Sequence, residues 1–413
     1  MAQKHKTAQG GGQSKNAQQA ISLHKKLGGK IRISPSTPVR NRVDLALVYT
    51  PGVAAVSTLV AGTKKALRAK SEQIKLAKEY TIKGKMVAVI SDGSAVLGLG
   101  NIGPYGALPV MEGKCALFKA FAHVDAFPIV LDISNEAGVP LTIKDVGYID
   151  RVVETVQAVA PAFGGINLED FAAPNCFEIE ERLKALLDIP VMHDDQHGTA
   201  IVVLAALINA AKVVKKDLKK LKVVVAGAGA AGTAVTKLLL LAGVKDVTVL
   251  DSQGTINKDR LDLSAHKKEL ANSTNPKNLL GNLADALVGA DAIIGVSGPG
   301  LMTAKDVRLM ADKAIVFGLA NPTPEIMPEE AAKGGAAVIA TGRSDYPNQI
   351  NNSLAFPGIF RGALDHKVSK ITDQMKLKAA KNLAALVKVP TAAKIIPGPF
   401  DHGVMEAVSR AVR

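Results

Sequence analysis

The chain has 413 residues, which at roughly 150 residues per domain is enough for two or three domains with a substantial core. Its formal net charge of +14 lies at the two ends: residues 1–43 carry nine basic side chains and no acidic one, residues 366–413 carry nine against three, and the part between carries 33 against 34. This distribution excludes a basic groove through the fold, and an aromatic content of 4% without Trp argues against a base-stacking surface for nucleic acid.

The N-terminal segment 1–19 is rich in Gly, Gln, Ser and Lys and is predicted to be disordered, because it offers too few apolar side chains to offset the entropy of ordering. It lacks the apolar core of a secretory signal. The longest apolar run, 200–211, contains Asn209 and is too short to span a bilayer. Cys115 and Cys176 are too few for a disulfide framework, so we expect a reducing, cytoplasmic location.

Two regions with different patterns follow along the chain. From residue 20 to about 198, helical stretches such as 63–80 alternate with short β-type runs at 86–90 and 128–132. A helix predicted over 199–214 bridges to the second region, and a last helix is predicted over 373–387. The second region contains apolar runs typical of parallel strands that helices bury on both faces. These runs are 222–226, 246–250, 292–296, 314–318 and 337–340.

We therefore predict an α/β fold with two main domains. The first, at 20–198, is an N-terminal α/β unit, and the second, at 199–389, is a Rossmann-type domain with a doubly wound parallel sheet. Residues 1–19 form a basic tail and 390–413 a C-terminal extension. Internal repeats and heptad arrays are not found, which argues against solenoids and coiled coils.

A glycine pattern directly after the run 222–226 predicts a dinucleotide site. Gly227, Gly229 and Gly232 form GxGxxG, and a helical stretch follows at once. The first two glycines allow a tight turn and close approach of the backbone to a pyrophosphate, and the third allows the helix to pack on the strand. The helix N-terminus adds partial positive charge. The predicted cofactor-binding segment consists of Gly227, Gly229, Ala230, Ala231 and Gly232.

Asp251 ends the second strand of this unit, 19 residues beyond Gly232. A carboxylate at this place accepts hydrogen bonds from the ribose hydroxyls, and its charge disfavours a 2′-phosphate, so the sequence favours NAD over NADP. A structural alternative is that Asp251 caps a turn with Ser252 and Gly254.

Two acidic pairs in the first region are candidates for metal binding. Glu169 and Asp170 lie in INLEDFAAP, and Asp194 and Asp195 lie in VMHDDQHGTA just before the predicted bridging helix. Three carboxylates from two segments, without a Cys or His set of zinc spacing, suit Mg²⁺ or Mn²⁺. The spacing alone leaves open that these acids cap helices or lie solvated at turns.

Two further side chains could take part in proton transfer. Lys114 lies in VMEGKCALFKAF, where apolar neighbours can desolvate it and lower its pKa toward that of a useful base. Tyr49 precedes Thr50-Pro51-Gly52, a turn that could hold the ring over a cleft. The structural alternatives are an ordinary lysine whose stem covers apolar surface and a tyrosine at the boundary with water.

Together these residues resemble one family, the malic enzymes, and within it the short bacterial type. The matching motifs run in order from about residue 20 to 365 and so cover most of the chain. They are RVDLALVYTPGV, VISDGSAVLGLGNIGPYGALPVMEGKCALFK, NLEDFAAPNCFEIE, PVMHDDQHGTA, VVVAGAGAAGTA, ANPTPE and TGRSDYPNQINNSLAFPGIFRGALD.

The resemblance implies a role for each residue of the site. It implies that the divalent cation binds to Glu169, Asp170 and Asp195, with Asp194 just outside and also near the substrate. It makes Lys114 the general base and Tyr49 the general acid. Asn321 and Asn352 match asparagines that contact substrate and nicotinamide. Larger relatives carry an Arg for the substrate carboxylate where this chain has Ala95, so that carboxylate must be held by other groups.

The implied reaction is the oxidative decarboxylation of L-malate to pyruvate and CO₂ with NAD, or NADP, as oxidant and Mg²⁺ or Mn²⁺ as cofactor. We expect a cytoplasmic homodimer or larger homo-oligomer that acts on a small molecule and binds neither nucleic acid nor membrane. Three alternatives remain from the sequence: a metal-independent NAD-linked dehydrogenase of another small hydroxy or amino acid, an anion or nucleic-acid binder that uses the basic ends, and a catalytically silent scaffold.

Overall fold

A computed structural model describes residues 15–27, 30–49, 51–96, 98–135, 138 and 141–413. The predicted disorder of residues 1–14 lies outside these ranges, but residues 15–19 differ from the prediction because helix α1 spans Lys15–Leu27. Good helix formers, Ala, Gln, Leu and Lys, make up most of this stretch.

The first sheet is fully parallel and has the strand order β4-β3-β5-β6. Its strands are β3 (Met86–Ser91), β4 (Asp125–Val130), β5 (Gly165–Leu168) and β6 (Val191–His193). The central strand β3 is buried on both faces, because Val87 and Val89 pack with α5 (Gly103–Ala122) and α14 (Phe356–Asp365), whereas Ala88 and Ile90 pack with α6 (Tyr148–Val159) and α7 (Asn175–Leu186). Strand β4 begins three residues before the predicted run.

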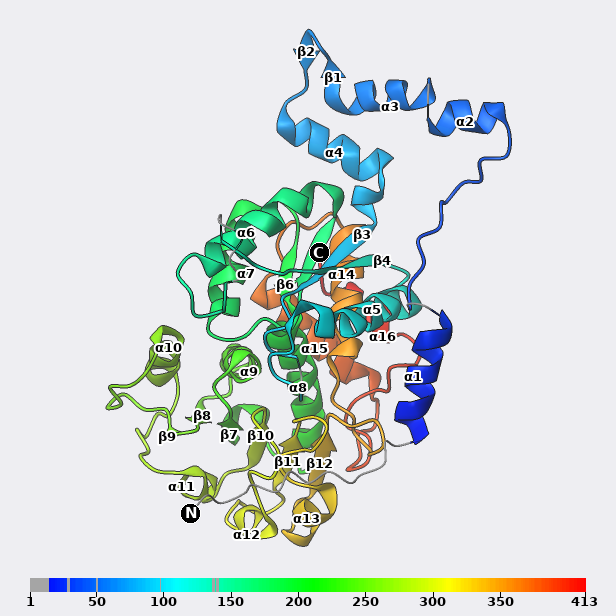
Figure 1. Cartoon of the computed structure of the whole chain (residues 1–413). Helices are drawn as coiled ribbons and strands as arrows, with labels where there is room; N and C mark the ends of the chain where they lie inside the picture. Colours follow the sequence, from blue (N-terminus) through cyan, green and yellow to red (C-terminus); the bar gives the residue numbers. More distant parts are fainter. Residues whose placement is uncertain (1–14, 28–29, 50, 97, 136–137, 139–140) are drawn as a thin grey trace, which may run out of the picture.

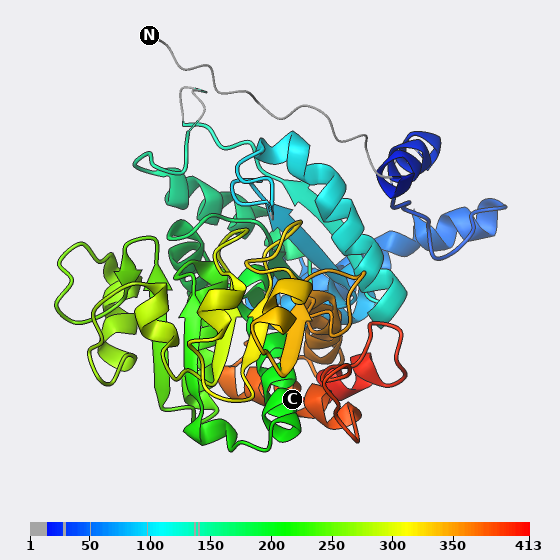
Figure 2. The same cartoon turned by 90° about the horizontal axis from the view of Figure 1, so that it is seen from below.

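The second sheet has the order β12-β11-β10-β7-β8-β9, and all strands except β9 are parallel. The strands are β7 (Lys222–Ala226), β8 (Asp246–Asp251), β9 (Gly254–Thr255), β10 (Ala292–Gly295), β11 (Ile315–Gly318) and β12 (Val338–Thr341). Apart from the short β9, they follow the predicted runs to within one residue, and in Figure 2 they run side by side from green to gold. The strand order reverses between β7 and β10, the switch point at which doubly wound sheets bind ligands.

Helices cover both faces of the second sheet. One face packs against α8 (Asp194–Val213) and α9 (Ala230–Leu241), and the other against the short helices near β10 to β12. The remaining helices are α10 (Ala265–Ser273), α11 (Leu283–Leu287), α12 (Ala304–Val307), α13 (Pro328–Lys333), α15 (Asp373–Leu386) and α16 (Val404–Ser409). Short 3₁₀ turns span Ile82–Gly84, Ala160–Ala162, Leu218–Lys220 and Asn352–Leu354.

The bridging helix α8 starts directly after β6 and runs into the core of the second unit (Figure 1). It begins at Asp194, five residues before the predicted start, and two acids in its first turn favour that start. Two stretches are long and apolar enough to cross a membrane, Arg42–Ala61 and Asp194–Val213. The second is α8, which is a mostly buried core helix.

The segment 42–80 forms an arm that projects from the rest of the molecule in Figure 1. It consists of α2 (Arg42–Val48), α3 (Gly52–Ala61), a hairpin of β1 (Gly62–Thr63) and β2 (Ala66–Leu67), and α4 (Lys70–Tyr80). The helix predicted over 63–80 is therefore wrong in its first part. Gly62, with φ of +84°, ends α3, and Thr63 accepts a hydrogen bond from the backbone of Ala66, which closes a turn. We call this segment the arm, and the chain from Thr81 onward the body.

Candidate active site

The two acidic pairs meet at the carboxyl edge of the first sheet. Glu169 and Asp170 follow β5 directly, and Asp195 lies in the first turn of α8, directly after β6. One oxygen from each of these three carboxylates lies within 4.8 Å of the others. The backbone N–H of Asp170 donates to Oδ2 of Asp195 at 2.8 Å, and this hydrogen bond ties the two segments together. The parallel order of β5 and β6 thus brings residues 25 positions apart into one cluster.

Lys114 reaches this cluster from α5 and is buried there. Its Nζ lies 2.6 Å from Oδ2 of Asp194 and 2.7 Å from Oε1 of Glu169, and 4.4 Å from the centre of the Phe356 ring. Burial lowers the pKa of Lys114, but the negative charges of Asp194, Glu169 and Asp195 outweigh this effect and raise it above its usual value. The surroundings of Lys114 are therefore charged, whereas the sequence suggested apolar neighbours that lower its pKa.

The cluster holds more negative charge than one lysine can balance. Burial and the neighbouring acids together raise the pKa of Glu169 well above its usual value in spite of Lys114, and burial raises that of Asp194 to about 6. A divalent cation would relieve this repulsion, and an oxygen-only donor set of three carboxylates is the chemistry that Mg²⁺ or Mn²⁺ prefers. Glu169, Asp170 and Asp195 therefore fit such an ion.

Glu180 on α7 supports the cluster from behind, and the sequence reasoning missed it. This buried carboxylate accepts from the backbone N–H of His193 at 2.9 Å, contacts Nε2 of His197 at 2.9 Å and pairs with Lys184 at 2.7 Å. Burial opposes its ionisation, but His197 and the nearby lysines hold the pKa of Glu180 well below its usual range. Glu180 lies four residues after Cys176 on the buried face of α7, whose other members, Ile179 among them, are apolar. An acid within such an apolar face was the sequence signal that could have revealed it.

A second support fixes the loop after β3 against the Asp170 segment. Tyr148 donates its hydroxyl to Asp92, and Ser94 donates to Oδ1 of the same carboxylate at 2.7 Å. Ser94 also accepts from the backbone N–H of Ala172, and the N–H of Ala95 donates to the carbonyl of Asp170 at 2.8 Å. These contacts place Ala95 beside the cluster.

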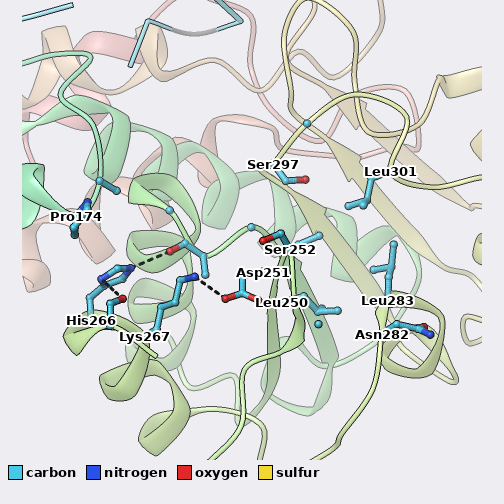
Figure 3. Close-up of a pocket in the computed structure, with 18 of the residues that line it drawn as sticks. Pro174, Leu250, Asp251, Ser252, His266, Lys267, Asn282, Leu283, Ser297 and Leu301 are labelled. Carbon is cyan, nitrogen blue, oxygen red and sulfur yellow. Dashed lines mark hydrogen bonds and ion pairs between the residues drawn. The ribbon is translucent and has the colours of Figure 1, made fainter. Parts of the chain in front are cut away.

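Gly227 and Gly229 of the predicted segment line a cavity of about 730 Å³ at the switch point of the second sheet (Figure 3). Gly227 has a φ of +123°, and a Cβ there would stand 2.5 Å from the carbonyl oxygen of Val296 in the loop after β10. Gly232 lies in the first turn of α9, where a Cβ would meet the carbonyl of Gly227 at 1.8 Å. Side chains are therefore excluded at both positions, and the N-terminus of α9 begins beside Gly229.

Asp251 lines the same cavity, but its carboxylate is already paired (Figure 3). Arg260 donates to both of its oxygens, at 2.7 and 3.1 Å, and Lys267 donates at 2.6 Å. Burial opposes ionisation, but these hydrogen bonds lower the pKa of Asp251 to about 2. Two cations next to the acid offset its repulsion of a 2′-phosphate, so the electrostatic preference for NAD inferred from the sequence is weakened.

Replacing Lys267 with Ala is expected to lower kcat/KM for NADP⁺ about tenfold relative to that for NAD⁺, because Lys267 contacts Asp251, where the sequence predicts the ribose to bind, and a charged hydrogen-bond donor there would favour a phosphate. Kinetics with both cofactors measure this ratio. Lys268→Ala is the matched control, because Lys268 is the next residue on α10 and is exposed. An unchanged NADP⁺ to NAD⁺ ratio in Lys267→Ala would show that Lys267 serves Asp251 only.

A smaller cavity of about 280 Å³ lies between the part of the chain that forms the first sheet and the part that forms the second. Its lining brings together Asp195 from the cluster, Ala230 and Ala231 from the first turn of α9, and the two predicted asparagines, Asn321 and Asn352. Ala95 and Thr199 also line it. The cavity is thus bounded on one side by Asp195 of the carboxylate cluster and on the other by Ala230 and Ala231 of the predicted cofactor segment.

Tyr49 lies away from the carboxylate cluster and from both cavities. It caps the C-terminus of α2 on the arm, the residue is 66% exposed, and it lines neither of the two cavities described above. In Figure 1, α2 lies at the far end of the arm from β6 and α8.

Glu325, in the ANPTPE motif, is a further residue that the sequence reasoning did not single out. Its fully buried carboxylate accepts from the backbone N–H of Ser297 at 2.8 Å and from that of Ala320 at 3.0 Å. It therefore joins the loops after β10 and β11, which carry Ser297 and Asn321 in the smaller cavity. A buried charge held by backbone donors is costly to change.

Glu325→Gln is expected to lower kcat/KM for the cofactor about ten- to hundredfold, because its amide group would face a backbone N–H and a misfit hydrogen bond of this kind costs about 1–3 kcal/mol. Cofactor Kd and kcat/KM are the measurements. Glu329→Gln, an exposed acid four residues on, is the control. Equal cofactor kinetics in Glu325→Gln and wild type would contradict a positioning role.

Two family models match this chain, one in each of its two parts. The family model for the malic enzyme N-terminal domain matches residues 28–184, and the model for the malic enzyme NAD-binding domain matches residues 196–402. An NAD-dependent malic enzyme of Geobacillus stearothermophilus is 53% identical over 94% of this chain and 76% of its own length. A bifunctional malic/malolactic enzyme of Bacillus subtilis is 50% identical over 96% and 92%. Other bacterial relatives bear the name NADP-dependent malic enzyme.

Among solved structures, the crystal structure of an NAD-dependent malic enzyme from Thermotoga maritima has a TM-score of 0.87 at 46% sequence identity. The match covers 95% of this chain and 98% of that one. The fold similarity thus extends over both sheets.

Proposed function

Since this chain belongs to the malic enzyme family, we propose a role for each site residue in the reaction of that family, the oxidative decarboxylation of L-malate to pyruvate and CO₂ with reduction of NAD(P)⁺. The enzyme acts on a small molecule with a nicotinamide dinucleotide as oxidant, and relatives of both NAD-dependent and NADP-dependent name match it. The individual residue roles are the proposal.

Glu169, Asp170 and Asp195 would hold the divalent cation, Mg²⁺ or Mn²⁺. When bound, the cation acidifies the malate hydroxyl and stabilises charge on the enolate oxygen, and the nicotinamide accepts the hydride. Gly227, Gly229 and Asp251, which line the larger cavity, would bind the dinucleotide there, and Gly232 would let α9 pack close to the Gly227 turn. Ala230 and Ala231, which line the smaller cavity, would lie next to the substrate. Asn321 and Asn352 would orient substrate and nicotinamide in the smaller cavity.

Lys114 would accept the proton of the malate hydroxyl. Its present contacts with Glu169 and Asp194 favour the ammonium form. A cation held by Glu169 and Asp195 would offset the negative charges with which these two residues favour the ammonium form, and Asp194 would remain as the charge that favours it. Asp194, whose Oδ2 contacts Nζ, would hold the amine toward the substrate.

Tyr49 would act after CO₂ leaves. Its hydroxyl would give a proton to C3 of the enolate of pyruvate while the C2 oxygen becomes a carbonyl, and the tyrosine would regain a proton from Lys114, which received one from malate. This sequence returns both side chains to their starting protonation states, so it balances over one turnover.

We also propose the remaining features of the enzyme. Residues 20–198 would form the substrate and metal domain and 199–389 the cofactor domain, flanked by the tail 1–19 and the extension 390–413. The enzyme would be a homodimer or larger homo-oligomer. Two buried free cysteines support a location in the cytoplasm, and the near-neutral middle of the chain supports the absence of a nucleic-acid or membrane partner.

The observation that supports these roles most strongly is the contact of Lys114 with two buried carboxylates, Asp194 and Glu169. Glu169 belongs to the three-carboxylate cluster, and Asp195 of that cluster lines a cavity together with Ala230 and Ala231. The test is the rate of NAD(P)H formation from L-malate with Mn²⁺ and with EDTA. We expect the rate to require both malate and the metal. Activity that is insensitive to EDTA would favour the metal-independent dehydrogenase instead.

A further inference from the structure

Lys376 is a buried lysine for which the proposed reaction has no use. It lies on α15, is 4% exposed, and lines neither of the two cavities described above. Burial of a lysine amine is costly unless its N–H groups find acceptors. The acceptors here are Oδ1 of Asp373 at 2.9 Å and Nδ1 of His197 at 3.1 Å. The contact with His197 ties α15 to the first turns of α8.

The contacts of His197 fix which of its ring nitrogens carries the proton. The ammonium group of Lys376 only donates, so Nδ1 of His197 accepts and the ring proton is on Nε2. Nε2 then donates to Oε2 of Glu180 at 2.9 Å. With the proton on Nδ1 instead, two donors would face each other at Lys376 and two acceptors at Glu180. Lys376 therefore selects the form of His197 that donates to Glu180.

Glu180 connects His197 to the segment that carries Asp195. Its Oε1 accepts from the backbone N–H of His193, the last residue of β6, at 2.9 Å. Gln196 donates to Nδ1 of His193 at 3.1 Å, so Nε2 of that ring carries the proton, and Nε2 lies 3.3 Å from Oδ2 of Asp195. Glu180 thus fixes a residue whose ring lies against Asp195, and such contacts behind a metal ligand set the direction of its carboxylate.

We propose that Lys376 is a positioning residue for Asp195. It holds His197 in the form that donates to Glu180, and Glu180 holds the end of β6, from which Asp195 reaches the cation. This rests on the proposed function, in which Asp195 binds the cation. Helix α15 follows the second sheet in the chain, whereas Glu180 precedes β6. The C-terminal part of the chain therefore helps to form the metal site without contacting the metal.

Lys376→Met tests this role, because methionine keeps an apolar stem in the buried position and removes the donor. The Kd for Mn²⁺, measured by electron paramagnetic resonance, is expected to rise about tenfold, the low end of the effect of groups that orient a metal ligand from behind. Loss of a positive charge would by itself tighten the binding of a cation, so the sign of the change separates positioning from simple electrostatics. An unchanged or lower Kd for Mn²⁺ would overturn the proposal.

A second variant tests whether Lys376 acts through His197. His197→Phe removes the donor to Glu180 directly and is expected to raise the Kd for Mn²⁺ by about tenfold or more. The double variant Lys376→Met/His197→Phe should bind Mn²⁺ as weakly as His197→Phe alone, because the two changes break the same chain of contacts. Additive losses in the double variant would overturn the proposal. A wild-type Kd in His197→Phe would also overturn it, even if Lys376→Met fails to fold.

Lys378→Met is the matched control, because Lys378 is exposed on the same helix, and its Kd for Mn²⁺ should stay within about twofold of wild type. NAD(P)H binding, followed by fluorescence, should also stay within about twofold in Lys376→Met. A merely structural role predicts instead a lower melting temperature with an unchanged Kd for Mn²⁺ in the folded protein. Absence of Mn²⁺ binding in the wild-type enzyme would refute the metal role of Asp195 and this inference together, whereas wild-type binding that Lys376→Met leaves intact would refute this inference alone.

Discussion

Asp195→Ala is expected to reduce malate-dependent NAD(P)⁺ reduction by about 10³-fold or more, because Asp195 is one of the three carboxylates that we propose hold the metal, and its loss would remove several kcal/mol of charge stabilisation. Asp195 also accepts a hydrogen bond from the backbone N–H of Asp170. Its removal would therefore loosen the contact between the loop after β5 and the first turn of α8. Mn²⁺ affinity, followed by electron paramagnetic resonance, should fall in parallel with kcat.

The cofactor site provides the internal check on this variant. Gly227 and Gly229 line the larger cavity, and Asp195 does not, so NAD(P)H binding measured by fluorescence should stay within about twofold of wild type. Asp150→Ala is the matched control, because Asp150 is an exposed acid on α6 that pairs with Arg182. Wild-type Mn²⁺ affinity and turnover in Asp195→Ala would contradict the proposal that Asp195 binds the metal.

Lys114→Ala is expected to lower kcat by about 10²- to 10⁴-fold, the usual worth of a general acid or base. Lys114 is also the cation that balances Glu169 and Asp194, so this variant loses a charge partner as well as a base. Mn²⁺ affinity separates the two effects. A purely electrostatic role predicts changed metal binding with kcat restored at saturating Mn²⁺, whereas a proton-transfer role predicts that kcat stays low.

Lys119→Ala is the matched control for this change. Lys119 lies on the same helix, is largely exposed and pairs with Asp125 at the surface. Its replacement should leave kcat within about twofold, since exposed ion pairs contribute little. Equal kcat in Lys114→Ala and Lys119→Ala at saturating metal would show that Lys114 is structural.

Local patterns were enough to predict the strand, turn and helix that place the glycines at the larger cavity. Strand, glycines and helix follow one another within about 20 residues, so the positions of Gly227 and Gly232 depend on the chain nearby. Strands β5 and β6 were not among the predicted runs, and it is their parallel pairing that brings Glu169 and Asp170 to the same edge of the sheet as Asp195.

Contacts between distant segments were not predictable in the same way. Arg260 and Lys267 neutralise Asp251 because of how α10 and the loop before it fold back, and no spacing rule encodes that contact. Glu180 and Glu325 act through backbone groups of other loops. The position of Tyr49 depends on where the arm points, and the short hairpin at Gly62 that sets this direction was predicted as helix.

The most direct test of the central claim follows the fate of the carbons of L-malate. Malate labelled with carbon-13 in its β-carboxylate is incubated with the enzyme, Mn²⁺ and NAD⁺ or NADP⁺, and CO₂, pyruvate and reduced cofactor are measured together. We predict that labelled CO₂, pyruvate and NAD(P)H form in equal amounts and that EDTA abolishes all three. Oxaloacetate with the label retained, or lactate without net reduction of the cofactor, would contradict the account.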